Sequence, residues 1–189
     1  MESEIRQLHI FFFPFPAHGH MIPTADMAKL FGTHGVKTTL ITTPANAPLF
    51  SKSVQRANEL GIQIDIKIIK YPSVEGISML QESLELRLRE YKPECLVAYM
   101  LFPWATDSAH KFGIPRFVFH GTSFFAVCAG TCVALYQPHK KVSSDSEPFV
   151  IPNLPGDIKL TRNQLADFVK QDVGETSFIK LFEAAAESG

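Results

Sequence analysis

Two histidines stand close together in the stretch QLHIFFFPFPAHGHMIP, residues 7–23. An imidazole titrates near neutral pH, so it can accept a proton from a hydroxyl group during a reaction. His20 follows an apolar run and precedes a helix-like pattern, and a helix N-terminus disfavours a positive charge nearby. We therefore predict that His20 lies on a loop beside a helix N-terminus as a neutral, basic imidazole. If the protein is an enzyme, we expect His20 to be its central catalytic residue.

Other interpretations of this turn stay open. A histidine on a loop is often only solvated or hydrogen-bonded. His18 and His20 together make an incomplete metal-ligand set, because no Cys, Asp or Glu stands close by. The turn holds one glycine, Gly19, and no G-x-G-x-x-G pattern, so it is poorly suited to hold a pyrophosphate on backbone N–H groups. We expect a small-molecule or catalytic site here, without a metal.

The pattern of apolar residues predicts the elements that position this turn. The run 8–13 is typical of a strand buried on both faces, and the following helix has Pro23 near its start. Strand and helix patterns then alternate along the chain. Further strands are predicted at 36–42, 62–69, 95–99 and 114–120, and further helices at 44–60, 78–91, 103–112 and 122–136. This alternation predicts an α/β fold with a doubly wound, mostly parallel, Rossmann-like sheet and helices on both faces.

The predicted topology brings distant residues to one edge of the sheet. In the strand order 3-2-1-4-5 the first and fourth strands are neighbours, and the loops at their carboxyl ends form a ligand crevice. Tyr99 then lies beside the histidine turn. The crevice is expected to be an aromatic pocket for a flat apolar ligand, formed by Phe15, His18, His20, Tyr99, Phe102, Trp104, His120, Phe124 and Phe125. The alternative is that some of these aromatic residues belong to the core, which we favour for Trp104 and leave open for Phe124 and Phe125.

Composition narrows the class of protein. The 189 residues carry a net charge of −1 and show no basic stripe, so we expect no nucleic-acid partner. The N-terminal MESEIRQ does not resemble a signal peptide, and polar residues interrupt the apolar region 117–136, so we expect no membrane span. The cysteines at 95, 128 and 132 form no C-x-x-C pattern. Cys128 and Cys132, one helical turn apart, are interpreted as small core residues, which indicates a reducing compartment. A soluble, cytoplasmic protein is expected.

The composition also predicts how the chain is divided. Residues 1–137 hold the alternating pattern and are expected to form the core of one domain. Residues 138–160 are rich in proline and serine and are interpreted as an irregular connection. Residues 161–189 carry two short helical patterns, near 161–170 and 176–187.

Three longer stretches carry a resemblance to a known family. They are FPFPAHGHMIP, CLVAYMLFPWATDSAHKFGIPRFVFHGTSFF and SEPFVIPNLPGDIKLTRNQLADF. Together they resemble the N-terminal domain of plant UDP-glycosyltransferases, enzymes with two Rossmann-like domains (the GT-B fold), over residues 7 to 187. The resemblance implies inverting transfer of a sugar, glucose foremost, from a UDP-sugar to a hydroxyl of a phenolic, flavonoid or terpenoid. It implies no metal and no cofactor besides the UDP-sugar co-substrate.

The resemblance also implies roles for individual residues. His20 matches the family's general base, which takes the proton of the acceptor hydroxyl. Acceptor contacts fall on Phe15, His18, Gly19, Phe124 and Phe125, and the residues facing the sugar donor are His120, Gly121 and Thr122. The family's aspartate, which holds the base, falls on Tyr99 in LVAYM. A phenol is neutral at pH 7 and cannot offset the charge of an imidazolium. Asp107 is a candidate substitute, although a structural role on its helix is the simpler interpretation.

Two further departures from the family pattern concern whole segments. The connection between Tyr71 and Met79 is short, which implies a more open acceptor site. The family's second domain, which grips the UDP-sugar, does not follow Gly189, so that domain is the expected packing partner of this chain. We therefore expect a truncated chain that is inactive alone. The alternative is a non-catalytic module that binds small molecules, or a degenerate gene product.

Overall fold

The computed structural model describes residues 7–69 and 76–170. Contacts divide the chain into two units, the first up to Gly121 and the second from Thr122 onward. Most of the short connection predicted near residues 71–79, and the whole helix predicted at 176–187, lie outside the described residues.

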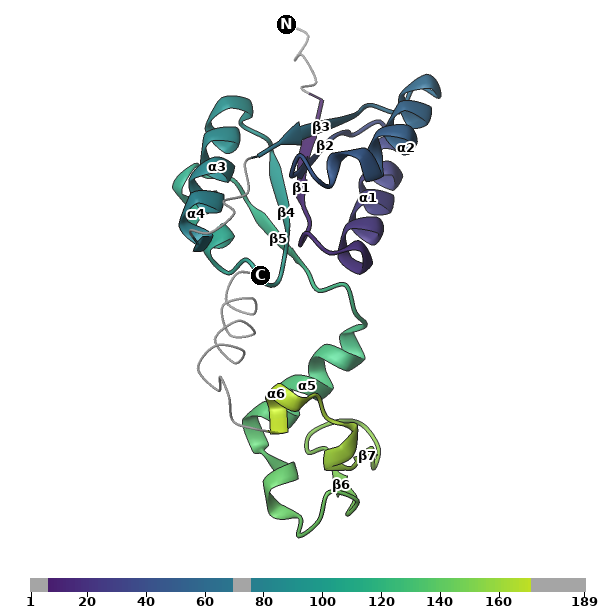
Figure 1. Cartoon of the computed structure of the whole chain (residues 1–189), viewed down its shortest axis with the longest axis vertical. Helices are drawn as coiled ribbons and strands as arrows, with labels where there is room; N and C mark the ends of the chain where they lie inside the picture. Colours follow the sequence, from purple (N-terminus) through teal and green to yellow (C-terminus); the bar gives the residue numbers. More distant parts are fainter. Residues whose placement is uncertain (1–6, 70–75, 171–189) are drawn as a thin grey trace, which may run out of the picture. The chain divides into compact units, whose positions relative to one another are not determined.

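The first unit is built on a five-stranded sheet in the order β3-β2-β1-β4-β5, as predicted (Figure 1). Its strands are β1 (His9–Phe13), β2 (Lys37–Thr42), β3 (Ile64–Ile68), β4 (Cys95–Tyr99) and β5 (Arg116–Phe119). Every neighbouring pair is parallel. The central strand β1 pairs with both β2 and β4, so Phe12 lies opposite Leu40 on one side and Val97 on the other. The strand order reverses at β1, and a ligand crevice is expected beyond its carboxyl end.

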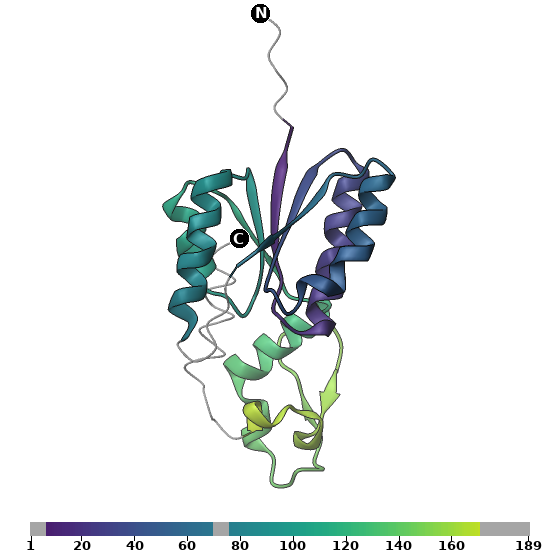
Figure 2. The same ribbon diagram turned by 45° about the horizontal axis from the view of Figure 1, so that its top comes forward.

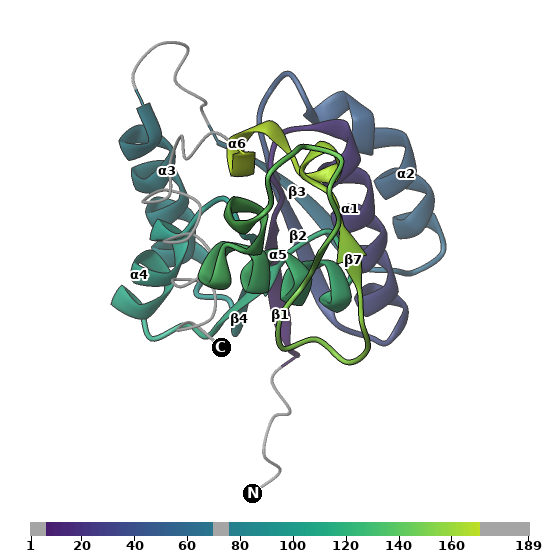
Figure 3. The same cartoon turned by 90° about the horizontal axis from the view of Figure 1, so that it is seen from below.

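Helices cover both faces of this sheet. They are α1 (His18–Thr33), α2 (Ala47–Glu59), α3 (Gly76–Tyr91) and α4 (Trp104–Lys111). Helices α1 and α2 lie together on one face and α3 and α4 on the other, as Figures 2 and 3 show. Phe11 and Phe12 are both fully buried, because successive side chains of a strand point to opposite, covered faces. The predicted fold class is therefore confirmed.

The start of α1 differs from the prediction. The helix begins at His18, five residues before Pro23, so His20 lies in its first turn and not on a loop. The backbone N–H groups of His20 and Met21 both donate to the Ala17 carbonyl at 2.9 Å. Ala17 offers no side-chain cap, so this helix start has no capping signal in the sequence. The helix ends as expected, with Gly35 in the left-handed region just after it.

The second unit begins with α5 (Phe124–Tyr136), whose predicted cap is confirmed by a hydrogen bond from the Ala126 N–H to the Ser123 hydroxyl, at 3.2 Å. Short elements follow: η1 (Pro138–Lys141), β6 (Phe149–Val150), β7 (Lys159–Leu160), η2 (Arg162–Gln164) and α6 (Asp167–Lys170). Strands β6 and β7 form an antiparallel ribbon, so the proline-rich segment is more regular than expected. The buried core of the second unit is formed by Val133, Phe149 and Ile151.

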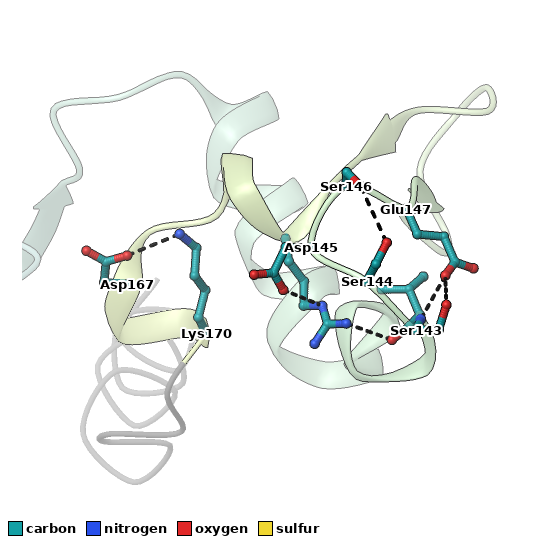
Figure 4. Close-up of polar contacts among 9 residues, drawn as sticks. Ser143, Ser144, Asp145, Ser146, Glu147, Asp167 and Lys170 are labelled. Carbon is teal, nitrogen blue, oxygen red and sulfur yellow. Dashed lines mark hydrogen bonds and ion pairs between the residues drawn. The ribbon is translucent and has the colours of Figure 1, made fainter.

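Hydrogen bonds and an ion pair stabilise the turn between η1 and β6 (Figure 4). The Glu147 carboxylate accepts hydrogen bonds from the backbone N–H of Ser143 at 2.7 Å and from its hydroxyl at 2.6 Å. The Arg162 guanidinium pairs with Asp145 at 3.3 Å and donates to the Val142 carbonyl at 2.8 Å. A segment with few apolar residues is thus held by its own serines and acids.

The two cysteines of the second unit and helix α5 are less buried than their apolar character suggests. Cys95 is buried. Cys128 is exposed, so its interpretation as a core residue is wrong, whereas Cys132 is half-buried and packs against the core of the second unit. Helix α5 carries apolar residues all round, yet much of it is exposed within its own unit. Within residues 7–69 and 76–170, no helix is both long and apolar enough to cross a bilayer.

Candidate functional site

His20 meets Tyr99 where strands β1 and β4 end. The centres of the two rings are 4.5 Å apart and their planes are inclined by 58°. Phe15, on the loop before α1, places its ring edge against His20 at 5.6 Å, nearly perpendicular to it. The predicted juxtaposition of the histidine turn and Tyr99 is therefore present. His20 itself is half-buried, which leaves part of the imidazole open to a ligand.

Tyr99 is the buried member of this site. It is the last residue of β4 and only 5% exposed. Its ring also lies 6.0 Å from that of Phe15 and 6.2 Å from that of Phe119. Burial raises the pKa of the Tyr99 phenol above its usual value of 10, so the group is uncharged at neutral pH.

Gly121 brings the backbone against this pair of rings. Its φ is +67°, in the region that favours glycine. A Cβ atom added there would lie 3.1 Å from Cε2 and 3.2 Å from Oη of Tyr99, and 3.6 Å from Nδ1 of His20. Nδ1 of His20 therefore lies beside the backbone at Gly121. A side chain at position 121 would press on both rings.

Arg116 is a member of the site that the sequence did not single out. It is the first residue of β5, is 8% exposed, and donates to the Tyr99 carbonyl at 3.2 Å and the Pro103 carbonyl at 3.4 Å. It also donates to the hydroxyl of Thr106. Burial lowers the pKa of Arg116 to about 10, and the nearby Asp107 carboxylate opposes that shift. The only sequence signal was an arginine inside the apolar strand GIPRFVFH.

His120 follows β5 and is half-buried. Burial lowers the pKa of His120, and the positive charge of Arg116 lowers it further. His120 is therefore a neutral imidazole at pH 7. Asp107 is exposed on α4 and acts electrostatically on Arg116, which fits the structural interpretation of this residue better than a role as the partner of His20.

A second aromatic group lies behind the site. Phe102 is buried and stacks on Phe13, with ring centres 4.6 Å apart. Trp104 contacts Phe102 at 5.4 Å and Phe13 at 6.0 Å. Phe15 joins the two groups through its contact with Phe102 at 5.9 Å. Phe102 thus belongs to the core, and Trp104 is only partly covered.

The remaining predicted residues are distributed between the units. His18 and Gly19 are exposed in the first turn of α1. Thr122, Phe124 and Phe125 belong to the second unit, where Phe124 is 86% and Phe125 is 55% exposed. Their exposure gives no support to the open alternative that these two phenylalanines are core residues, and their contact with an acceptor stays a prediction. Among the described residues, no three His, Cys, Asp or Glu side chains cluster as a metal site.

Two hollows lie elsewhere on the first unit. A cavity of about 10 Å³ beneath the loop after β1 holds at most a water molecule, and its walls include Pro14, Met21 and Phe102. A surface groove of about 790 Å³ runs between the end of β3 and α3, lined by Ile68, Leu86 and Arg87 among others. The groove is large enough for a small molecule, so it is the rival location for ligand binding.

Comparison with known proteins gives a consistent result, although no family model matches the chain. The chain is similar to scopoletin glucosyltransferase of Nicotiana tabacum (49% identity over 96% of this chain and 43% of the relative). It is also similar to UDP-glucose flavonoid 3-O-glucosyltransferase 7 of Fragaria ananassa (47% identity, 96% and 40%). The chain thus spans about 40% of the length of the curated relatives it matches.

Solved structures agree with this similarity. UGT73P12 of Glycyrrhiza uralensis, crystallised with glycyrrhetinic acid 3-O-monoglucuronide, matches 96% of this chain and 41% of its own, with a TM-score of 0.85 and 33% identity. UGT71G1 of Medicago truncatula, crystallised with UDP-glucose, has a TM-score of 0.70 at 19% identity and supports the fold alone. The resemblance to plant UDP-glycosyltransferases, and to the N-terminal Rossmann-like half of their fold, is confirmed.

Proposed function

We propose that this chain, which is homologous over 96% of its length to plant UDP-glycosyltransferases, is the acceptor-binding part of such an enzyme. The observation that supports this most directly is the contact of His20 with Tyr99, beside the Gly121 backbone, at the switch point of the sheet. A half-buried imidazole among aromatic rings suits a flat acceptor with a hydroxyl group. The acceptor would be a plant phenolic, flavonoid or terpenoid.

The proposed reaction is an inverting sugar transfer. The acceptor oxygen attacks the anomeric carbon of the sugar, and the bond from that carbon to the UDP oxygen breaks, so UDP leaves with the electron pair. The acceptor hydroxyl gives its proton to the His20 imidazole. Acceptor contacts are assigned to Phe15, His18, Gly19, Phe124 and Phe125, and the donor sugar is assigned to His120, Gly121 and Thr122. No metal or resident cofactor takes part in this scheme; the UDP-sugar is a substrate.

The relatives are more than twice as long as this chain. We propose that both units of the chain belong to one acceptor-binding domain, and that a further domain is needed to hold the UDP group. The second candidate function is a non-catalytic module that binds small molecules. It is favoured by Tyr99, because a buried neutral phenol cannot stabilise a protonated His20 as a carboxylate does.

Calorimetric titration of the 189-residue chain tests the proposed site. We expect a flavonol to bind and UDP-glucose to bind weakly or not at all. His20→Ala should weaken flavonol binding, whereas His34→Ala, a matched change at the exposed far end of α1, should not. Binding of UDP-glucose without the flavonol would contradict the proposal and would assign the crevice to a nucleotide.

A further inference from the structure

Strand β4 passes into helix α4 through a short turn that carries two residues of the candidate site. The turn begins at Tyr99, which contacts His20, and it contains Phe102, which contacts Phe15. Helix α4 follows at once and has no side-chain cap at its N-cap residue, Pro103. The paired residues of β4 end at Tyr99, so contacts from outside the strand pairing help to decide where the turn lies.

One buried guanidinium joins both ends of this turn. Arg116 of β5 lies opposite Leu96, so its long side chain extends along the sheet toward the carboxyl ends of the strands. It donates to the Tyr99 carbonyl at 3.2 Å, at the start of the turn. It also donates to the Pro103 carbonyl at 3.4 Å and to the hydroxyl of Thr106, at the start of α4. Because a guanidinium is planar and rigid, it holds these acceptors at fixed positions relative to one another.

The two aromatic residues of the turn pack closely against the candidate site. The ring of Tyr99 lies 4.5 Å from that of His20, and a Cβ atom added at Gly121 would lie only 3.1 Å from Cε2 of Tyr99. Phe102 lies 5.9 Å from Phe15, whose ring edge meets His20 at 5.6 Å. A shift of the turn would therefore change the packing of both rings that contact the imidazole.

We propose that Arg116 is a positioning residue of the acceptor site, whose guanidinium fixes the turn after β4 and so holds the Tyr99 ring against His20. This inference rests on the proposed function and adds a residue to that same site. Arg116 is 8% exposed and directs its hydrogen bonds at the turn, so it acts through Tyr99 and Phe102 and not by touching the acceptor. His20 keeps its role as the group that accepts the proton.

The test reads the imidazole carbon–proton NMR signals of His20 in the 189-residue chain. An aromatic ring 4.5 Å away displaces these signals, because its π electrons produce a local magnetic field. We expect Arg116→Lys to move the His20 signals toward those of a solvated histidine, at a pH where the imidazole is neutral. A lysine keeps the charge but cannot hold three acceptors with a rigid fork. The affinity for a flavonol, measured by calorimetry, should fall about tenfold.

Two further variants separate positioning from stability. Val54→Ala removes two methyl groups from the buried face of α2, which lowers stability without touching the turn after β4. Its His20 signals and its flavonol affinity should match those of the unsubstituted chain. Thr106→Val removes one of the three acceptors of Arg116 and keeps the shape of the side chain. It should move the His20 signals in the same direction by less, and it decides the question if Arg116→Lys fails to fold.

The outcomes separate this inference from the function on which it rests. Unchanged His20 signals and unchanged affinity in folded Arg116→Lys, or in Thr106→Val if only that variant folds, would overturn the inference and leave the acceptor site standing. Equal changes in Val54→Ala would also overturn it, because they would come from lower stability alone. If the unsubstituted chain binds no flavonol, the proposed function fails, while the His20 signals of the variants still decide whether Arg116 positions the Tyr99 ring.

Discussion

At the scale of single residues, the site depends on side chains whose protonation state at neutral pH does not change. Tyr99 stays neutral because it is buried, and His120 stays neutral because burial and Arg116 both lower its pKa. Arg116 stays charged, since its pKa of about 10 is still well above neutral pH. The contact between Tyr99 and His20 could be predicted from topology, but the role of Arg116 could not, because a long side chain reaches oxygens that no local pattern identifies.

Arg116 should matter for stability as well as for the site. Arg116→Met leaves the carbonyls of Tyr99 and Pro103 without their buried donor, so the free energy of unfolding should fall by about 2 kcal/mol. Urea unfolding followed by Trp104 emission measures it. Arg89→Met, which removes an exposed arginine from α3, is the control and should change little. Equal effects of the two substitutions would show that the buried hydrogen bonds contribute nothing specific.

Tyr99 should also determine which acceptors react. In a chain completed with the remainder of a relative, Tyr99→Asp should raise transfer to a weakly acidic alcohol by about tenfold or more, because His20 gains a partner for its protonated form. Transfer to an acidic phenol should gain less, since a more acidic hydroxyl gives up its proton more readily without that partner. Initial rates with both acceptors give the ratio. An unchanged rate in a folded variant would show that Tyr99 does not determine which acceptors react.

At the scale of helices and strands, the sequence predicted most of the first unit. Apolar runs mark β1 to β5, and glycines with positive φ, such as Gly35 and Gly61, end the helices before β2 and β3. The start of α1 was missed because Ala17 cannot cap a helix with its side chain. The ribbon of β6 and β7 was missed because each strand has only two residues, too few for any periodicity to show.

Close packing of α1 gives a test at this scale. A Cβ atom at Gly32 would lie 2.5 Å from Cγ2 of Ile62, so Gly32→Ala should destabilise the protein by about 1 kcal/mol despite its better helix propensity. Gly130 in α5 has open space around it, and Gly130→Ala should stabilise its helix by about 0.5–1 kcal/mol. Chemical unfolding followed by circular dichroism compares the two. Stabilisation by both substitutions would contradict the tight contact at Gly32.

The stability contributed by the polar contacts between α3 and α4 should depend on pH. Glu85 accepts a hydrogen bond from Lys111 at 2.6 Å and one from Ser108 at 3.1 Å, and the bond from Lys111 is the main reason that the pKa of Glu85 lies below its usual 4.5. A carboxyl group with a lowered pKa stabilises the fold above its unfolded pKa, and this contribution is lost as pH falls through the folded value.

Glu85→Gln should therefore lower the free energy of unfolding at pH 7, modestly because Lys111 is exposed. The difference from the unsubstituted chain should shrink as pH falls from about 5 to about 3. Glu82→Gln on the exposed side of α3 is the matched control. Urea unfolding at several pH values gives both curves, and a difference that stays constant with pH would refute the role of the carboxylate charge.

At the scale of the whole molecule, the described chain consists of two units with separate cores. The first has the sheet and the second is organised on Val133, Phe149 and Ile151. The contacts divide the described chain after Gly121. The sequence places one core through residue 137 because α5 is apolar all round, and this division of the chain into core and connection stays a prediction.

Residues 1–121 should fold without the rest. Their sheet, four helices and buried Phe102 beside Trp104 form a complete core. The shortened chain should unfold cooperatively in urea, with the same midpoint for Trp104 emission and for circular dichroism. Loss of cooperative unfolding would show that the sheet depends on the second unit.

The central claim is that a small-molecule acceptor binds at His20. The most direct test is to record the imidazole carbon–proton NMR signals of the chain during titration with a flavonol, with His20 assigned by His20→Gln. The signals of His20 and His120 should move with one affinity, while that of His34, at the far end of α1, should stay in place. Binding that leaves His20 unchanged and instead moves the methyl signals of Ile68 and Leu86 would place the ligand in the groove beside α3 and contradict the account.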